Sequence, residues 1–213
     1  MVSAPFNTLW REYDEWFEKH RNLYLNELKA IELASKSAPK PWLEVGVGTA
    51  RFASPIGIEF GIDPSTPMLD IARLRGVDVA TAIGEELPFR SKSFGSVFMV
   101  VTLCFLDNPT KALCEAYRVL VDGGKLIVGF VPLDSDWGRH YQRLKEQGHR
   151  FYRFARFYTV DEALDLLRSS GFLPELYIST LRLSKPGGAE VLENPIPGLY
   201  RDAGFVVVRA SKA

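Results

Sequence analysis

Apolar positions follow a helical period at the start of the chain and form short runs after residue 41. Over the first 36 residues, aromatic and aliphatic side chains recur at steps of three and four, which predicts helix with one packed face. The positions are Tyr13, Trp16, Phe17, His20, Tyr24, Leu28 and Ile31, and His20 is interpreted as a packed histidine. Later apolar runs bounded by glycine or proline are typical of buried strands. They predict seven strands, at residues 42–45, 56–62, 77–82, 96–101, 125–131, 172–181 and 204–209.

The segments between the strands carry helix signals, including a capping-box pattern at Thr159 and Glu162. Strand–helix alternation over residues 42–131 predicts right-handed βαβ units and a parallel sheet. The connection at residues 182–203 is rich in proline and glycine and has no convincing helix. It therefore favours antiparallel pairing of the last two strands at the sheet edge.

Length and charge narrow the class of protein. The chain has 213 residues, of which 46% are hydrophobic and 24% charged, as expected for one globular domain over residues 1–213. Within it, residues 1–38 are expected to form N-terminal cap helices, and residues 132–158 and 182–203 to be insertions on the substrate side. Lys+Arg and Asp+Glu both number 26, so a bulk affinity for nucleic acid is not expected.

The compartment expected from the sequence is the cytoplasm. The two cysteines form no disulfide framework, which suits a reducing environment, and no metal site is predicted. The N-terminus has no signal-peptide pattern, and the longest apolar stretch, residues 97–106, is half of what a membrane span needs.

A glycine-containing loop after the first strand suggests a ligand site. Gly46 and Gly48 allow a tight turn and a close approach to the main chain, and Asp63 ends the next strand, where a carboxylate can accept hydrogen bonds from a ribose. A dinucleotide fingerprint would need a third glycine where Arg51 stands, and Glu44 would repel a pyrophosphate. The pattern therefore favours S-adenosylmethionine, which has a ribose, an amino acid end and a sulfonium but no phosphate.

Ordered motifs strengthen this interpretation, because the chain resembles the class I S-adenosylmethionine-dependent methyltransferases. The subgroup it most resembles methylates small molecules such as quinones and related metabolites. The resemblance rests on residues 43–50, 61–69, 85–94 and 118–124, with a later helix at residues 159–172. It implies an α/β, Rossmann-like three-layer sandwich with a seven-stranded, mostly parallel sheet of order 3-2-1-4-5-7-6, in which strand 7 is antiparallel.

The resemblance also implies an enzyme that transfers the methyl group of S-adenosylmethionine to a small molecule and leaves S-adenosylhomocysteine. It assigns cofactor binding to strand tips and the loops that follow them. The implied residues are Glu44, Gly46, Val47 and Gly48 for the methionine end, Asp63 and Pro64 for the ribose side, Met68, Gly84 and Glu85 toward the adenine, Val101 and Thr102 on the methyl-transfer side, and Tyr13 from a covering helix.

Departures from the family pattern occur at three positions. Ala50 replaces the usual third glycine of the first motif, and its methyl group is tolerated only if the local φ is negative. Ile83 stands where an aspartate often receives the adenine amino group, and Gly95 replaces another common aspartate. These changes leave open a non-catalytic protein that binds the cofactor.

The acceptor is less constrained by the sequence. Methyl transfer by in-line displacement needs a general base only if the acceptor loses a proton, and His140 and His149 are the candidates. Arginines interleave with aromatic residues over residues 139–158, which suits an anionic or aromatic small molecule. The same pattern leaves an RNA substrate as an alternative, and the oligomeric state stays open.

Overall fold

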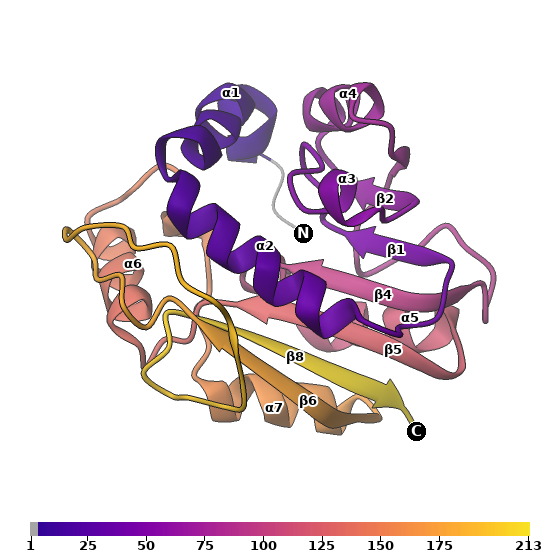
Figure 1. The fold of residues 1–213 in the computed structure, drawn as a ribbon. Helices are drawn as coiled ribbons and strands as arrows, with labels where there is room; N and C mark the ends of the chain where they lie inside the picture. Colours follow the sequence, from indigo (N-terminus) through magenta and orange to yellow (C-terminus); the bar gives the residue numbers. More distant parts are fainter. Residues whose placement is uncertain (1–3) are drawn as a thin grey trace.

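The computed structural model describes residues 4–213 and shows an α/β fold in which helices cover both faces of one sheet (Figure 1). The described strands follow the order β3-β2-β1-β4-β5-β8-β6-β7. Their bounds are β1 Trp42–Val45, β2 Phe60–Asp63, β3 Asp78–Thr81, β4 Phe94–Val100, β5 Leu120–Phe130, β6 Phe172–Thr180, β7 Ile196–Pro197 and β8 Phe205–Lys212.

The predicted sheet is confirmed with one addition. The strand expected last, now β8, pairs antiparallel with both β5 and β6, so the order 3-2-1-4-5-7-6 holds for the predicted strands. The addition is the two-residue β7, which pairs antiparallel with β6 at the sheet edge. Two boundaries were wrong. The second strand begins at Phe60 rather than residue 56, because α3, Ala53–Ile56, occupies the start of that apolar run. The fifth strand begins at Leu120 rather than residue 125 and runs through Gly123 and Gly124.

Helices pack on the two faces of the sheet, and others extend beyond one end of it (Figure 1). The chain breaks between the first two helices at His20, whose φ of −112° and ψ of 46° are not helical. The bounds are α1 Ala4–Lys19, α2 Arg21–Ser35, α4 Thr66–Leu74, η1 Leu103–Phe105, α5 Pro109–Val119, α6 Asp136–Glu146, η2 Tyr152–Phe154 and α7 Val160–Ser169.

The core lies in two clusters, one on each side of the sheet. Leu113 of α5 and Leu164 of α7 belong to the first, while Ile31 of α2 and Leu69 of α4 belong to the second. Every residue of β4 is buried, as its unbroken apolar run predicts for a central strand. Helices on both sides of a fully buried strand make the three-layer sandwich.

Strand register brings the predicted ligand residues to one edge. β1 pairs in parallel with both β2 and β4, and Glu44 lies opposite Gly61 on one side and Phe98 on the other. Parallel strands end at the same edge, so the loops after β1, β2 and β4 start next to one another. In open α/β sheets, this point between neighbouring strand ends is where ligands bind.

The connection between β6 and β8 contains no helix and is held against α2. The Asn26 side chain donates to the Val191 carbonyl at 2.8 Å and accepts from the Glu193 N–H at 2.8 Å. Trp137 of α6 donates from its indole N–H to the Ser184 carbonyl at 2.9 Å. This loop therefore joins α2 to α6.

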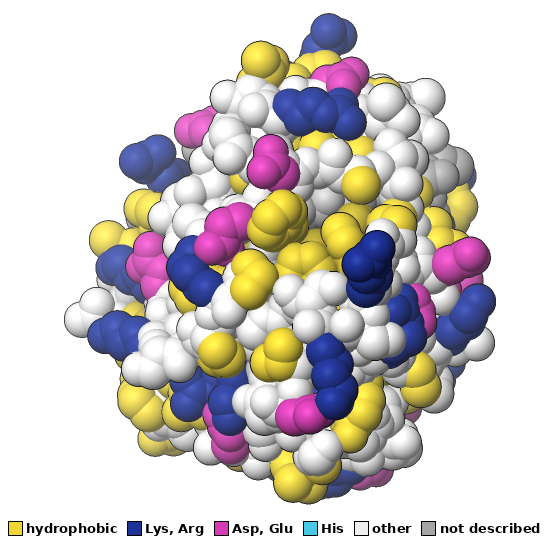
Figure 2. All heavy atoms as spheres, turned by 90° about the vertical axis from the view of Figure 1, so that its right-hand side faces the viewer, with side chains coloured by type: hydrophobic (Ala, Val, Ile, Leu, Met, Phe, Trp, Pro, Cys, Tyr) yellow, Lys and Arg dark blue, Asp and Glu magenta, His cyan; other side chains and the backbone are white. Residues whose placement is uncertain are grey.

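Figure 2 shows the face to the right in Figure 1, where basic, acidic and apolar side chains are interspersed. Exposed ion pairs on the surface of the chain include Lys92 with Asp122 and Arg73 with Asp70. Within residues 4–213, no helix is long and apolar enough to cross a membrane.

Candidate functional site

The turn after β1 is held against β2 by backbone hydrogen bonds. The N–H groups of Gly46 and Val47 both donate to the Ile62 carbonyl, at 2.8 and 2.9 Å. A side chain at Gly61 would lie 2.7 Å from Val47, so the absence of one allows Val47 to pack on β2. Gly46 and Gly48 have φ of +76° and +52°, a region that favours glycine.

The two glycines of this turn have different neighbours. A Cβ at Gly46 would lie 2.6 Å from the Thr102 side chain, so this glycine makes room for the residue after β4. A Cβ at Gly48 would lie 3.8 Å from both the Met68 sulfur and the Tyr13 ring. Gly48, Met68 and Tyr13 therefore border one space above the loop.

Two residues without glycine's freedom also take positive φ at this edge. Ala50 has φ +62° and is fully buried, so the negative φ that would make its methyl group harmless is not what the chain adopts. Val101, at the tip of β4, has φ +53°, which is rare for a β-branched residue. Local backbone strain of this kind is common at functional sites.

Two buried carboxylates stand at neighbouring strand tips. Asp63 accepts hydrogen bonds from the Gly48 N–H at 3.1 Å and the Ser65 N–H at 2.8 Å, while burial raises its pKa to about 6. Glu44 is 1% exposed, and burial raises its pKa well above the usual value. Its Oε2 atom has no hydrogen-bond partner within residues 4–213.

The segment predicted on the adenine side is held by the residues just before α5. Gly84 and Glu85 are buried, and Glu85 Oε1 accepts from the N–H groups of Asp107 at 2.9 Å and Asn108 at 3.2 Å. Ile83, by contrast, is 37% exposed. Gly95 lies elsewhere, where a Cβ would be 2.4 Å from the Pro39 carbonyl, so an aspartate would not fit there.

An ion-pair cluster fixes α1 to the loop. Asp14 of α1 accepts from Thr49 Oγ1 at 2.6 Å, from Arg51 Nε at 2.8 Å and from both Nη atoms of Arg75 at 2.8 Å. These hydrogen bonds outweigh partial burial and lower the pKa of Asp14. The helix that carries Tyr13 is therefore tied to the turn after β1 and to the end of α4. We call Asp14, Thr49, Arg51 and Arg75 the α1 clamp.

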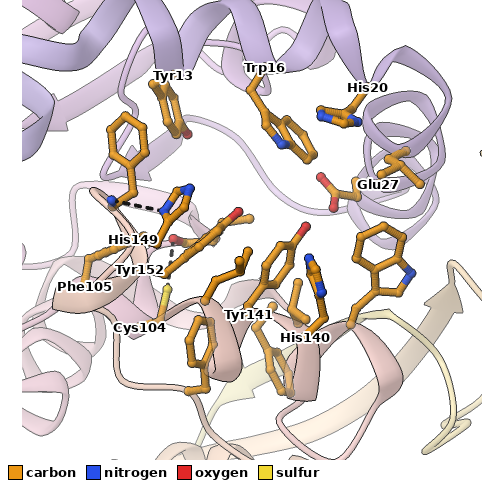
Figure 3. Close-up of a pocket in the computed structure, with 18 of the residues that line it drawn as sticks. Tyr13, Trp16, His20, Glu27, Cys104, Phe105, His140, Tyr141, His149 and Tyr152 are labelled. Atoms are coloured by element: carbon orange, nitrogen blue, oxygen red, sulfur yellow. Dashed lines mark hydrogen bonds between the residues drawn. The ribbon is translucent and has the colours of Figure 1, made fainter. Parts of the chain in front are cut away.

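A cavity of about 440 Å³ lies between α1, α2, α6 and the loop after β4 (Figure 3). Most of its walls are aromatic, and we call it the aromatic cavity. Tyr141 and Tyr152 lie 4.5 Å apart between ring centroids, and His149 stacks on Tyr152 at 4.6 Å. Tyr13, which borders Gly48, lines this cavity, and so does Val101, the residue before Thr102. Further lining residues are Phe6, Trp16, Phe17, Phe105, Phe130, Trp137, Phe151, Phe157 and Tyr158.

The histidines of the chain all border the aromatic cavity. Partial burial lowers the pKa of both His140 and His149, with Arg143 and Arg150 contributing. His20 was expected to be packed, but its side chain is 40% exposed, and its Nδ1 lies 2.5 Å from the Glu190 carboxylate. The ring also lies 4.9 Å from that of Trp16, so His20 is packed on one side and accessible on the other.

The polar groups of the aromatic cavity include an unpaired acid and a thiol. Glu27 of α2 is 5% exposed, makes no hydrogen bond or ion pair within residues 4–213, and has a pKa raised to about 8 by burial. Burial likewise raises the pKa of Cys104 to about 12, so its thiol stays protonated and is a poor nucleophile.

The arginines of the interleaved segment do not line the aromatic cavity. Arg150 pairs with Glu12, Arg139 pairs with Asp136, and Arg153 lies over the Phe154 ring. The aromatic residues of the segment, by contrast, do line it, with the exception of Phe154. The predicted aromatic contacts therefore have a counterpart in the cavity, and the predicted anion contacts have none among the described residues.

Known proteins resemble this chain both in sequence and in structure. Residues 43–128 match a family described as methyltransferase domain. A crystal structure from Thermotoga maritima, named as an S-adenosylmethionine-dependent methyltransferase and possible histamine N-methyltransferase, has 41% sequence identity and a TM-score of 0.91, covering 99% of each chain. The chain belongs to the S-adenosylmethionine-dependent methyltransferases. The predicted enzyme class and cofactor are thereby confirmed.

Other relatives of this methyltransferase leave its acceptor open. An uncharacterised protein of Mycobacterium tuberculosis is 41% identical over 201 residues, which cover 93% of this chain and 70% of that protein. A demethylmenaquinone methyltransferase of Thermus thermophilus is 36% identical over 112 residues, covering 47% of this chain and 51% of the relative.

The sequence patterns of this methyltransferase did not identify Glu27 as a residue of the aromatic cavity. It lies on the same face of α2 as Leu23 and Ile31, which are buried. A carboxylate at an apolar position of a helix is a signal that sequence reading can detect, because an acid is rarely buried without a purpose. His20 gave a weaker signal, since the partner of its ring comes from 170 residues away.

Proposed function

We propose that this methyltransferase transfers a methyl group to a small molecule held in the aromatic cavity. The observation that carries the proposal is that Tyr13 lines the cavity and borders Gly48, while Val101 lines the cavity next to Thr102, which packs on Gly46. A cofactor on the loop and an acceptor in the cavity would therefore meet at these two residues. The names of the Thermotoga protein, a possible histamine N-methyltransferase, and of the Thermus protein, a demethylmenaquinone methyltransferase, support a small acceptor.

The strand-tip residues fit the cofactor that the family uses. The unpartnered Glu44 Oε2 suits the ammonium of the methionine end, because a buried acceptor without a donor is costly. Asp63 has further lone pairs for ribose hydroxyls, although it already accepts two backbone hydrogen bonds. Gly48 leaves the main chain open beside Met68.

The remaining predicted cofactor contacts are retained as proposals. Each lies on a loop at the ends of β1, β2 or β4, or on the segment before β4. They are Gly46, Val47, Pro64, Gly84, Glu85 and Thr102, with Tyr13 covering the loop from α1.

The protein's contribution to the reaction is alignment and exclusion of water. When bound, S-adenosylmethionine supplies a methyl group activated by its sulfonium. Tyr13 and Val101 would set the line of approach, and the aromatic walls would keep water away from the reacting atoms. An acceptor that must lose a proton would find His140, His149 or the His20–Glu190 pair at the cavity wall.

Binding of S-adenosylhomocysteine tests the cofactor site. Calorimetric titration should give binding to the wild type and at least a tenfold loss for Asp63→Asn, because a neutral amide is a weaker acceptor for ribose hydroxyls. The control is Asp70→Asn on the neighbouring helix α4, whose carboxylate is 64% exposed and paired with Arg73. Absence of binding by the folded wild type would refute the proposal.

The two alternatives from the sequence predict different outcomes. An RNA substrate requires RNA binding that weakens steeply with salt, because each phosphate contact releases counterions. A non-catalytic member would bind S-adenosylhomocysteine but transfer no methyl group from labelled S-adenosylmethionine to any amine or quinone supplied. Transfer to a small acceptor, with weak RNA binding, is the result that supports the proposal.

A further inference from the structure

We propose that the acceptor carries a protonated amine that pairs with Glu27, while its apolar body lies against the walls of the aromatic cavity. This inference rests on the proposed function, because it names the class of molecule that the same cavity takes. It makes Glu27 a positioning residue that selects the acceptor.

The argument starts from the isolation of Glu27. Its side chain is 5% exposed and makes no hydrogen bond or ion pair with any other described residue. Figure 3 shows the carboxyl group directed into the aromatic cavity, beside Trp16 and across from Tyr141. A buried carboxylate without a partner is unfavourable, and proteins keep such groups mainly where a ligand completes them.

The surroundings of Glu27 favour a cation over an anion. Tyr141 and Trp137 lie 5.8 Å apart between ring centroids, and Trp16 adds a third electron-rich face on the cavity wall. Such faces attract ammonium groups through cation–π interactions. Lys19 is the one cationic lysine or arginine among the described lining residues, against the acids Glu12 and Glu27.

Other charged groups of the cavity are already paired. Glu12 forms an ion pair with Arg150, and His20 contacts Glu190. Lys19 hydrogen-bonds to Glu15 on its own helix, with both side chains largely exposed. Glu27 is therefore the acidic side chain of the described cavity walls that is left for a ligand, and an ammonium group beside it would favour its ionised form.

Glu27 lies on the side of the aromatic cavity opposite to Tyr13, so the group that would recognise the amine is apart from the place where the methyl group would arrive. In Figure 3, Tyr13 and Cys104 lie at one side of the aromatic cavity and Glu27 and His20 at the other. An amine held by Glu27 would thus place the rest of the acceptor toward Tyr13 and Val101, where the methyl group arrives. This arrangement suits an arylalkylamine, and it gives a neutral quinone no partner for the carboxylate.

The test measures amine binding directly. Calorimetry on the full chain, with and without saturating S-adenosylhomocysteine, would compare 2-phenylethylamine, tryptamine and histamine with the neutral 2-phenylethanol. We expect at least one amine to bind ten times more tightly than the alcohol. Glu27→Gln should remove that preference, whereas Glu32→Gln, an exposed position of the same helix, should keep it.

The outcomes separate this inference from the proposed function. If S-adenosylhomocysteine binds but no amine exceeds the alcohol, or if Glu27→Gln keeps the preference, the amine inference is overturned and the methyltransferase proposal stands. If an amine binds through Glu27 but S-adenosylhomocysteine does not bind, the proposed function is refuted and the amine site stands. Circular dichroism of each variant shows whether it is folded. If Glu27→Gln fails to fold, Glu27→Asp, which keeps the acid but shortens the side chain, should bind the amine with a reduced preference over the alcohol, and an unchanged preference would overturn the inference.

Discussion

At the scale of single residues, the ionisation of Glu27 is coupled to folding. Burial raises the pKa of Glu27 to about 8 in the folded chain, against a usual value of 4.5. Between these two pH values the folded chain keeps the proton and the unfolded chain releases it. The contribution of Glu27 to stability is therefore largest at low pH and is lost as the pH rises toward 8.

This coupling predicts a pH-dependent difference between wild type and Glu27→Gln. The free energy of unfolding of the wild type, relative to the variant, should fall by up to ~1.4 kcal/mol per pH unit between pH 5 and pH 8. Urea unfolding at pH 5, 6, 7 and 8 measures it. Glu32→Gln serves as the control and should follow the wild type. Parallel curves for wild type and Glu27→Gln would show that Glu27 titrates normally.

A second residue-scale prediction concerns backbone strain at Ala50. Ala50 and Ala112 are both fully buried, but Ala50 has φ +62° whereas Ala112 lies in α5. Replacement by glycine removes a buried methyl group in both, yet it relieves strain at the first and weakens a helix at the second. We expect Ala112→Gly to cost about 1–2 kcal/mol more than Ala50→Gly in urea unfolding. Equal costs would mean that Ala50 is unstrained.

At the scale of elements, the α1 clamp holds a helix over the loop after β1. Asp14 is 16% exposed and Arg51 14%, so the pair is screened less than a surface ion pair. Removing the Asp14 carboxylate leaves Arg51 with Glu18 and Arg75 with the Thr49 carbonyl, and it frees the Thr49 hydroxyl. The clamp thus controls how firmly Tyr13 covers Gly48.

Asp14→Ala should therefore loosen α1 without unfolding the sheet. We expect hydrogen exchange over α1 to speed up at least tenfold, because opening this helix would no longer require the ion pairs of the α1 clamp to be broken. Exchange over α5 should stay as in the wild type. Exchange mass spectrometry measures both regions in one experiment. The matched control is Glu15→Ala, whose carboxylate on the same helix is 60% exposed and pairs only with Lys19 among the described residues. Unchanged exchange in α1 would argue against a clamp.

Elements were predictable where local signals were complete. The capping box at Thr159 starts α7 as expected, since both of its hydrogen bonds form. The apolar run at residues 56–62 was divided wrongly, because an apolar stretch does not tell a short helix from a strand. The two-residue strand β7 has no signal in its own sequence, because it forms only by pairing with β6.

At the scale of the whole molecule, the order of strands and helices along the chain predicted the sheet and its ligand-binding edge. It did not predict the aromatic cavity. Strand–helix alternation fixes which strand ends adjoin, and that places Glu44 near Asp63. The cavity combines α1, α2, α6 and the loop after β4, and their mutual placement depends on packing between distant segments. Hence Glu27 could be noticed in the sequence as an odd buried acid, but its neighbours could not be derived.

Because the cofactor loop and the aromatic cavity share wall residues, we predict that cofactor binding rigidifies parts of the cavity as well as the strand tips. Tyr13 borders both the loop and the aromatic cavity, and its ring lies 5.2 Å from Phe17 and 6.2 Å from Phe151. A cofactor that orders Tyr13 should also restrain the neighbours packed on it, because close-packed rings move together.

Hydrogen exchange with and without S-adenosylhomocysteine tests this coupling. Protection should extend from the loop after β1 to α1 and to η2, while α7 on the other face of the sheet should be unaffected. In Asp14→Ala, where α1 is already loosened, the loop should still be protected and η2 should not. Protection of η2 in that variant would mean that the cofactor reaches the aromatic cavity by another route, for example through Val101 and Cys104. Protection of the strand tips alone, even in the wild type, would mean that the two spaces bind their ligands independently.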